Sequence, residues 1–244
     1  MRVLILGGTH EARRLATKLA LDARYEPLLS YAGRTENPEL PGDVACRVGG
    51  FGGAEALGVF LARFDALIDA THPFAAQISA NAVVAARAAD VPLLRLVRPA
   101  WPREDTWVEV ASMRAAAQAL GDAPKRVFLT IGRLEVGAFK HAPQHHYVVR
   151  AVDAFEPDLP DAKVIAARGP FRLDDERALL ERERIDVLVS KNAGTPATYD
   201  KLRAARERKL PVIMVARPVL PDAPEVATVE EAEAWLRHGS ERGE

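Results

Sequence analysis

The sequence contains a single cysteine, Cys46, among its 244 residues. One cysteine cannot form a disulfide within the chain or a multi-cysteine metal cluster, and this scarcity is typical of a reducing compartment. No apolar run reaches the roughly 18 residues of a membrane span, and residues 1–6 lack the long apolar core of a signal peptide. The sequence therefore predicts a cytoplasmic protein that crosses no membrane.

Neither sign of charge is in excess. The 33 Lys and Arg residues nearly balance the 34 Asp and Glu residues, and the formal net charge is -1. A balance so close to zero gives the protein no general attraction to nucleic acid or to an anionic membrane surface. Anion binding must therefore come from local clusters of basic residues, and we expect a small-molecule ligand rather than a nucleic acid.

Clusters of metal-binding residue types are also missing from the sequence. His141, His145 and His146 lie close together, but no Asp, Glu or Cys joins them at the spacing of a metal site. The sequence therefore predicts a solvated loop at these histidines and no bound metal.

Short apolar runs alternate with amphipathic segments along the whole chain. Fully apolar strands that are separated by helices indicate a parallel sheet with both faces covered. In the first half, the predicted strands are residues 2–6, 27–31, 44–48, 65–70 and 92–97, and the predicted helices are residues 10–21, 54–64, 73–89 and 112–120.

The same alternation restarts after a linker at residues 121–125. Here the predicted strands are residues 126–131, 147–152, 163–167, 186–190 and 211–216, and the predicted helices are residues 174–184, 196–208 and 229–237. The repetition predicts an α/β protein of two domains, residues 1–122 and 123–244, with mainly parallel sheets and an active-site cleft between them.

A glycine turn connects the first predicted strand to the first predicted helix through Gly7, Gly8 and Thr9. Glycine lets the backbone turn sharply and approach a ligand closely. The helix N-terminus adds unpaired N–H groups and the positive end of the helix dipole, which together suit a phosphate. The complete dinucleotide fingerprint would carry a third glycine, so an ordinary turn without a ligand is the alternative.

The second predicted strand ends in a segment that carries an arginine and no acid. In dinucleotide-binding folds an acidic residue at this place binds the ribose of NAD, whereas an arginine accommodates the 2′-phosphate of NADP. Arg34 is therefore the candidate for the 2′-phosphate, with Gly33 beside it and Ser30 and Thr35 as hydroxyl partners. A solvated surface arginine is the alternative.

The densest glycine run of the chain, residues 49–53, follows the third predicted strand. Four glycines in five positions are costly in conformational entropy unless a close approach requires them. We therefore expect Gly50, Phe51 and Gly52 to lie against the cofactor, with a flexible turn as the alternative.

The predicted strand at residues 65–70 leads into Thr71, His72 and Pro73. Pro73 fits the first turn of the following helix. Thr71 and His72 then lie at the carboxyl edge of the sheet, where we expect them to contact cofactor or substrate. A cap or a structural polar contact is the alternative for His72.

Basic and polar residues also follow the strands of the second half. Arginine forks match carboxylates bidentately, so these residues predict a basic wall that recognises several carboxylates. Ordinary surface charge is the alternative for each arginine. The residues are Arg133, Arg150, Arg168, Arg172, Lys191, Asn192 and Thr195.

Several of these segments together resemble the signature blocks of the precorrin-6A reductases of cobalamin biosynthesis. The blocks occur in the family's order and span the chain: Gly7-Gly8-Thr9 followed by Glu11, Ala32-Gly33-Arg34, residues 49–53, residues 69–75 and Ser190-Lys191-Asn192. The resemblance implies two Rossmann-like domains, an N-terminal one for NADPH and a C-terminal one for the substrate, with the active site between them.

The resemblance also implies a reaction, in which a hydride from NADPH reduces one double bond of the macrocycle precorrin-6A and gives precorrin-6B. The pyrophosphate would lie near Gly7, Gly8 and Thr9, and Arg34 would bind the 2′-phosphate. The carboxylates of the macrocycle would be held by Arg14, Arg133, Arg150, Arg168, Lys191, Asn192 and Thr195.

Three side chains are candidates for catalytic roles. Lys191 is the candidate for a mobile side chain that senses the substrate, and His72 or Tyr31 for a proton route. The protein otherwise supplies positioning, because the cofactor carries the chemistry.

Three other interpretations fit parts of the sequence. Related enzymes of the anaerobic pathway act on the cobalt-loaded macrocycle. A short-chain-like NADP reductase would share the first domain but accept small carbonyl compounds. A non-enzymatic regulator would bind NADPH without oxidising it. The sequence leaves the oligomeric state open and is compatible with a monomer.

Overall fold

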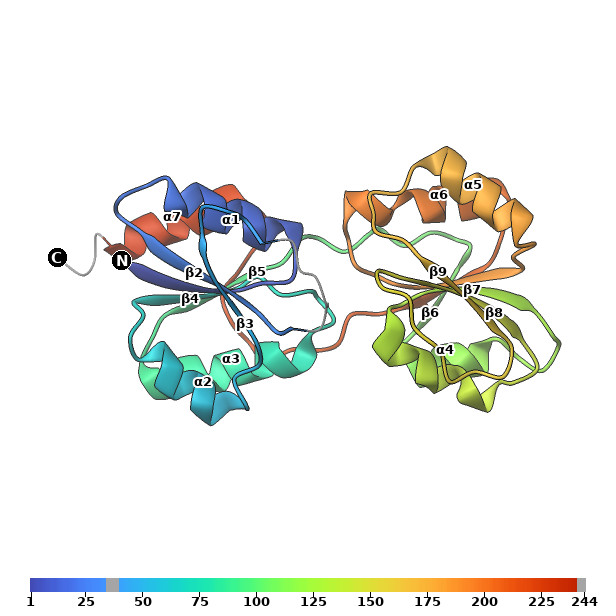
Figure 1. Cartoon of the computed structure of the whole chain (residues 1–244), viewed down its shortest axis with the longest axis horizontal. Coiled ribbons are helices and arrows are strands. Elements are labelled where there is room, and N and C mark those ends of the chain that lie inside the picture. The colour runs from blue at the N-terminus through green and yellow to red at the C-terminus, as the bar shows by residue number, and fades with distance from the viewer. Residues whose placement is uncertain (34–39, 241–244) are drawn as a thin grey trace. The chain divides into compact units, whose positions relative to one another are not determined.

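The computed structural model describes residues 1–33 and 40–240. The chain forms two compact units, one of residues 1–99 and 218–244 and one of residues 100–217. Each unit is a six-stranded parallel sheet with helices on both faces (Figure 1). This arrangement confirms the predicted α/β class with mainly parallel sheets.

The first unit has the strand order β12-β5-β4-β1-β2-β3. The chain starts at β1 and moves outward through β2 and β3, then returns to the other side of β1 for β4 and β5, so the order reverses between β1 and β4. The strands are β1 Arg2–Leu6, β2 Glu26–Tyr31, β3 Ala45–Val48, β4 Ala66–Asp69, β5 Leu93–Leu96 and β12 Glu225–Val226. The helices are α1 His10–Ala20, α2 Ala54–Leu61, α3 Ala76–Ala89 and α7 Val229–Ser240.

The second unit repeats this topology with the strand order β6-β11-β10-β7-β8-β9. The strands are β6 Trp107–Val110, β7 Arg126–Thr130, β8 His146–Ala151, β9 Ala162–Ala166, β10 Val187–Lys191 and β11 Val212–Val215. The helices are α4 Met113–Ala119, α5 Leu173–Arg182, α6 Asp200–Glu207 and the 3-10 segments η1 Arg133–His141 and η2 Pro196–Thr198.

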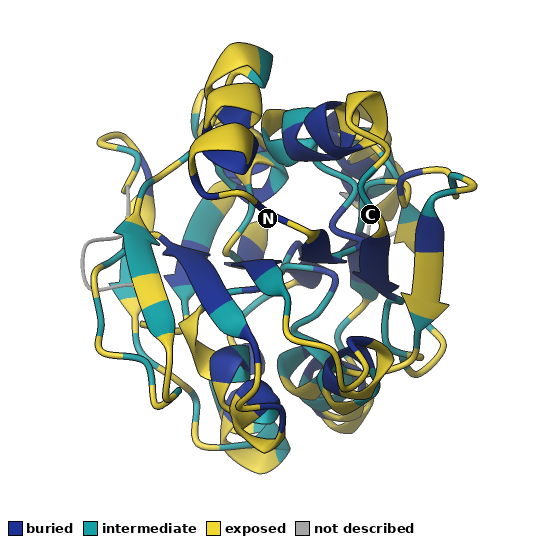
Figure 2. Cartoon of the chain, turned by 90° about the vertical axis from the view of Figure 1, so that its right-hand side faces the viewer, coloured by how far each residue is buried: buried dark blue, intermediate teal, exposed yellow. Residues whose placement is uncertain are grey.

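Buried apolar side chains on both faces of β1 explain why this strand is apolar throughout. Val3 and Ile5 belong to the core beneath α1 and α7, whereas Leu4 and Leu6 belong to the core beneath α2 and α3. Successive side chains of a strand point to opposite faces, so a sheet covered on both sides needs apolar residues at every position. Figure 2 shows the buried residues gathered in the sheets and on the inner faces of the helices.

The edge strands of the two sheets are exchanged along the chain. β6 pairs with β11 and so joins the second sheet, although it precedes β7 in the sequence. β12 follows β11 but pairs with β5 of the first sheet, and α7 follows it into the first core through Val229, Ala232 and Leu236. The two units therefore differ from the predicted division at residues 122 and 123.

The physical reason for this difference is that sheet membership depends on long-range hydrogen bonds. The backbone N–H of Arg95 donates to Pro224 O at 2.8 Å, and that of Val97 donates to Val226 O at 3.0 Å. No local pattern reveals such partners more than a hundred residues away. In the described part of the chain, no helix is both long and apolar enough to cross a membrane.

Candidate functional site

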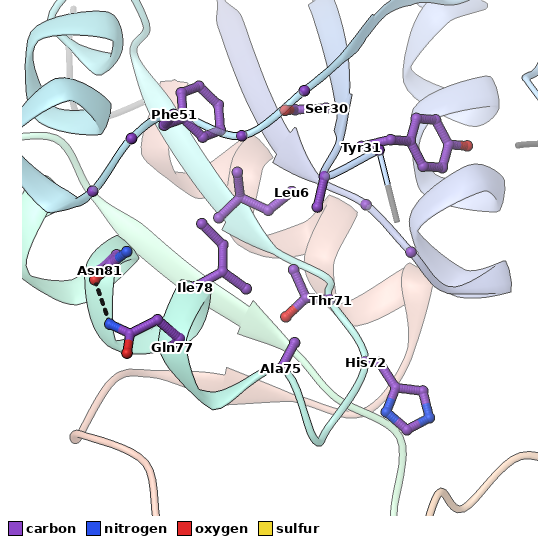
Figure 3. Close-up of a pocket in the computed structure, with 18 residues that line it drawn as sticks. Leu6, Ser30, Tyr31, Phe51, Thr71, His72, Ala75, Gln77, Ile78 and Asn81 are labelled. Carbon is purple, nitrogen blue, oxygen red and sulfur yellow. Dashed lines mark hydrogen bonds between the residues drawn. The ribbon is translucent and has the colours of Figure 1, made fainter. Parts of the chain in front are cut away.

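A cavity of about 450 Å³ lies at the carboxyl edge of the first sheet (Figure 3). Its walls come from the turns after β1, β2, β3 and β4 and from the first half of α3, and seven of the lining residues are glycines. The cavity straddles β1, where the strand order reverses. Open α/β sheets bind their ligands at this place.

The turn after β1 needs its glycines for two different reasons. A Cβ atom on Gly7 would lie 2.9 Å from Leu29 Cδ1 and 3.3 Å from Ser30 O, so β2 leaves no room for a side chain. Gly8 has φ +130°, a conformation that other residues rarely adopt, and a Cβ there would meet nothing within 4 Å. Bare backbone at Gly8 therefore borders open space.

Thr9 begins α1 and also fixes the helix to the neighbouring strand. Its Oγ1 accepts a hydrogen bond from Ala12 N at 3.1 Å and donates one to Ala70 O at 2.7 Å. Thr9 is thus the N-cap of α1. It is not among the residues that line the cavity, so its predicted contact with a cofactor stays a prediction.

The glycine run after β3 is held in place by Arg47, a residue that sequence reasoning missed. Arg47 Nη1 donates to Ser30 Oγ at 3.0 Å and to Gly49 O at 2.9 Å, and Nη2 donates to Gly50 O at 3.3 Å. The guanidinium lies 4.0 Å from the ring centroid of Phe51. One side chain therefore connects β2 to the glycine run by hydrogen bonds.

The turn after β4 presents Thr71 and His72 to the cavity, as predicted. Asp69, which is 2 % exposed, accepts hydrogen bonds through Oδ1 from Thr71 N at 3.2 Å and from Thr71 Oγ1 at 2.7 Å. His72 Nδ1 accepts a hydrogen bond from Phe74 N at 3.2 Å. His72 therefore stabilises the turn, and the proton of its neutral ring is assigned to Nε2.

The remaining residues predicted to bind a cofactor lie in part around the cavity. Ser30, Tyr31, Gly33, Gly50, Phe51 and Gly52 line it. Figure 3 shows the ring of Tyr31 pointing away from Leu6 and Ile78. Arg34 and Thr35 lie outside the described residues. The structure thus brings together the glycine turns and the strand ends that the sequence singled out in the first half.

The predicted carboxylate-binding residues of the second half have different surroundings. Lys191, at the end of β10, pairs with Glu135 through an Nζ–Oε1 contact of 2.8 Å. Arg133 and Arg168 are exposed, at the start of η1 and after β9 respectively. Thr195 is the N-cap of η2. Arg14 belongs to the first unit, on the exposed face of α1, where it pairs with Glu230 at 3.3 Å.

Two of these predicted residues have structural partners that the sequence did not reveal. Asn192 is buried, and its side chain accepts from Trp101 N at 2.8 Å and donates to Trp101 O at 3.1 Å. Arg150 is also buried, and its Nη1 donates to Glu176 Oε1 at 2.6 Å. Both side chains thus bind the protein itself, in contrast to the predicted wall that faces a ligand.

A buried lysine lies near this arginine. Lys201, on α6, is 4 % exposed, and its Nζ lies 5.5 Å from the ring of Trp101. Burial lowers the pKa of Lys201 to about 7, and the positive charges of Arg150 and Lys191 contribute to the shift, whereas Glu176 opposes it. The second unit therefore holds a buried cluster of one acid and two basic residues.

Comparison with protein families and with known proteins points to one family of reductases. The chain matches the family described as "Precorrin-6x reductase CbiJ/CobK" over residues 2–237. It is 50 % identical over 243 residues to the precorrin-6A reductase of Sinorhizobium sp, which covers 97 % of this chain and 93 % of the relative. It is 29 % identical to the cobalt-precorrin-6A reductase of Salmonella typhimurium, over 88 % of this chain and 87 % of the relative.

Comparison with solved structures agrees. The structure of CobK precorrin-6A reductase superimposes with a TM-score of 0.90 at 44 % sequence identity, over 98 % of this chain and 97 % of that one. A match of this extent covers both sheets and the exchanged edge strands.

Proposed function

This chain belongs to the precorrin-6x reductase family, and we propose that NADPH, bound in the cavity of the first unit, supplies the hydride with which it reduces precorrin-6A. The protein is thus an oxidoreductase that acts on a carbon–carbon double bond. The precorrin-6A reductases among its relatives, at 42 to 50 % identity, favour the metal-free macrocycle over the cobalt-loaded one, whose reductases are 29 % identical.

The observation that carries the choice of cofactor is the glycine-lined cavity at the reversal of strand order. A Cβ atom on Gly8, Gly50, Gly52 or Gly53 would meet no heavy atom within 4 Å, so bare backbone faces the open volume. The N-terminus of α1 begins at Thr9 beside this backbone and favours a pyrophosphate there. The residues present therefore fit a dinucleotide.

The two ends of the cavity fit the two halves of the cofactor. Adenosine binds beside the second strand in this fold, which is the side of Ser30 and Gly33. The nicotinamide half would then lie on the β4 side of the cavity, whose lining includes Thr71 and His72. Reduction adds a hydride to one carbon of the double bond and a proton to its neighbour, and NADPH held in this cavity would supply the hydride.

In this proposal the second unit supplies the groups that hold the macrocycle. Arg133 and Arg168 are exposed guanidinium groups at the carboxyl edge of the second sheet, where they suit carboxylates. The ammonium group of Lys191, at the end of strand β10, stays the candidate for a mobile side chain that senses the substrate. His72 and Tyr31 stay the candidates for a proton route from the first unit.

The direct test is calorimetry of NADP+ binding, followed by NADPH oxidation with precorrin-6A as the acceptor. We expect binding, and oxidation only when the macrocycle is present. Oxidation with small carbonyl compounds instead would identify another NADP reductase. Binding without oxidation would identify a sensor, and the absence of binding would refute the proposed cofactor.

Replacing Arg34 by alanine is expected to raise the KM for NADPH by roughly tenfold to a hundredfold and to leave that for NADH nearly unchanged. The reason is that only NADPH carries the 2′-phosphate that a guanidinium can bind. Steady-state kinetics with both nucleotides measures the effect. Arg24→Ala, which removes an exposed arginine paired with Asp22, is the control. An equal rise for both nucleotides would remove Arg34 from this role.

Replacing Arg47 by alanine is expected to weaken the binding of NADPH and NADH equally, by about fivefold to tenfold. Arg47 donates hydrogen bonds to Ser30, Gly49 and Gly50. Its loss is therefore expected to loosen the glycine run and not to remove a contact with a phosphate. Lysine cannot restore three such bonds because it lacks the planar fork. Dissociation constants of Arg47→Ala and Arg47→Lys measure this, and a selective loss of NADPH binding would contradict it.

A further inference from the structure

The hydroxyl group of Thr71 has a fixed orientation in the wall of the cavity. Thr71 lies in the turn after β4, and Figure 3 shows it there as part of the lining. Its Oγ1 lies 2.7 Å from Asp69 Oδ1 and 3.3 Å from Ser79 Oγ. A carboxylate oxygen accepts and an ionised partner makes the stronger bond, so the single proton of Thr71 goes to Asp69.

The direction of the second hydrogen bond follows from the first. Because the proton of Thr71 is committed to Asp69, the hydroxyl of Ser79 must donate in the contact with Thr71 Oγ1. A hydroxyl oxygen has two acceptor sites, and Ser79 occupies one of them. Thr71 therefore has one acceptor site left and no proton to offer to a ligand.

The other carboxylate oxygen of Asp69 forms an ion pair, without a hydrogen bond, with Arg95 on β5. The distance from Arg95 Nε to Asp69 Oδ2 is 3.7 Å, and both side chains are buried. Arg95 also pairs with Glu225 Oε1 and donates through Nη2 to Pro221 O at 2.9 Å, both in the segment that contributes the exchanged strand β12. This segment thus holds the arginine that forms the ion pair with Asp69.

A ligand group that meets Thr71 must consequently donate a hydrogen bond. In the proposed function the nicotinamide half of NADPH lies at this end of the cavity, and its carboxamide carries an N–H donor. We propose that Asp69 is a positioning residue that makes Thr71 Oγ1 an acceptor for this carboxamide, and so sets the orientation of the nicotinamide ring. This inference rests on the proposed function and adds to it a residue that touches no cofactor.

The test compares NADP+ with its 3-acetylpyridine analogue, which replaces the carboxamide by an acetyl group and so has no N–H to donate. Calorimetric dissociation constants are the readout, because the two nucleotides differ in redox potential and their turnover is not comparable. We expect the wild-type protein to bind NADP+ about tenfold more tightly than the analogue.

The variants separate the hydroxyl group from its orientation. Thr71→Ser keeps the acceptor and should keep the discrimination of about tenfold, whereas Thr71→Val should abolish it, chiefly by weakening NADP+. Asp69→Ala removes the acceptor of the Thr71 proton and should also lower the discrimination. Because Asp69→Ala removes a buried charge, its folding is checked by circular dichroism. If it fails to fold, the pair Thr71→Val and Thr71→Ser decides whether Thr71 Oγ1 accepts from the carboxamide.

Each other outcome has a definite meaning. Equal affinity of the wild-type protein for the two nucleotides overturns this inference and leaves the proposed function intact. An equal loss of both affinities in Thr71→Val also overturns it, because the donor would then be a ribose hydroxyl or no ligand group. If the wild-type protein takes up neither nucleotide, the proposed cofactor is refuted and this inference with it.

Discussion

Glu176→Gln is expected to lower the free energy of unfolding by about 3 kcal/mol, because it leaves a buried arginine without its counter-charge. The side chains of Arg150 and Glu176 are 6 % and 1 % exposed, and Nη1 lies 2.6 Å from Oε1. The guanidinium of Arg150 also lies 3.6 Å from the ring of Phe171. Arginine stays charged in proteins, so Arg150 cannot escape the loss by releasing its proton.

Chemical denaturation of the variant and the wild-type protein measures this effect. Asp174→Asn is the matched control, because Asp174 pairs with Arg177 on the surface of the same helix, α5, at 2.7 Å. An exposed pair contributes about 0 to 1 kcal/mol, so the control should change the stability little. The double variant Arg150→Met with Glu176→Leu removes both charges and should recover most of the loss. Equal stabilities for Glu176→Gln and Asp174→Asn would contradict the assignment.

Lys201→Met is expected to stabilise the protein at pH 7 by about 3 kcal/mol, with the gain fading as the pH rises. The pKa of Lys201 is lowered from 10.5 to about 7, mainly by burial. Between these two values the unfolded chain binds a proton that the folded protein does not bind. The free energy of unfolding of the wild-type protein therefore rises with pH through this window, by an amount on the order of 4 kcal/mol.

The measurement is the difference in unfolding free energy between the variant and the wild-type protein at several pH values from 7 to 10. We expect the difference to be largest near pH 7 and small near pH 10. Lys140→Met, at an exposed lysine of η1, is the control and should show no such trend. A difference for Lys201→Met that is independent of pH would show that the lysine is charged in the folded protein.

The sequence predicted the sheets of this protein well, because their signal is local. Strand β1 is apolar at successive positions because its side chains pack into the cores on both faces of the first sheet. This apolar run can be recognised in the sequence without knowing which helices and strands pack against it. The same holds for the glycine turns after β1 and β3, since backbone that approaches a ligand selects glycine at each position separately. Thr71 and His72 were found because they follow an apolar strand directly.

What the sequence did not reveal depends on contacts between distant residues. Arg47 is one charged residue in a short strand, and its role becomes visible only when β2 places Ser30 opposite it. The sequence around Arg150 is compatible with a surface arginine, and only the structure shows that Glu176 of α5 lies 2.6 Å from it. β12 has only two residues, so periodicity cannot detect it. Each of these features is set by pairing that no short window contains.

The exchange of edge strands determines how this protein can be divided. The chain passes from one unit to the other twice, at residues 99–100 and again at residues 217–218. A protease cut at the first passage would leave β12 and α7 on the larger fragment, still paired with β5 and packed in the first core. The first unit is built from two separate segments, so no single truncation can isolate it intact, whereas the second unit is one continuous segment, residues 100–217, inserted into the first.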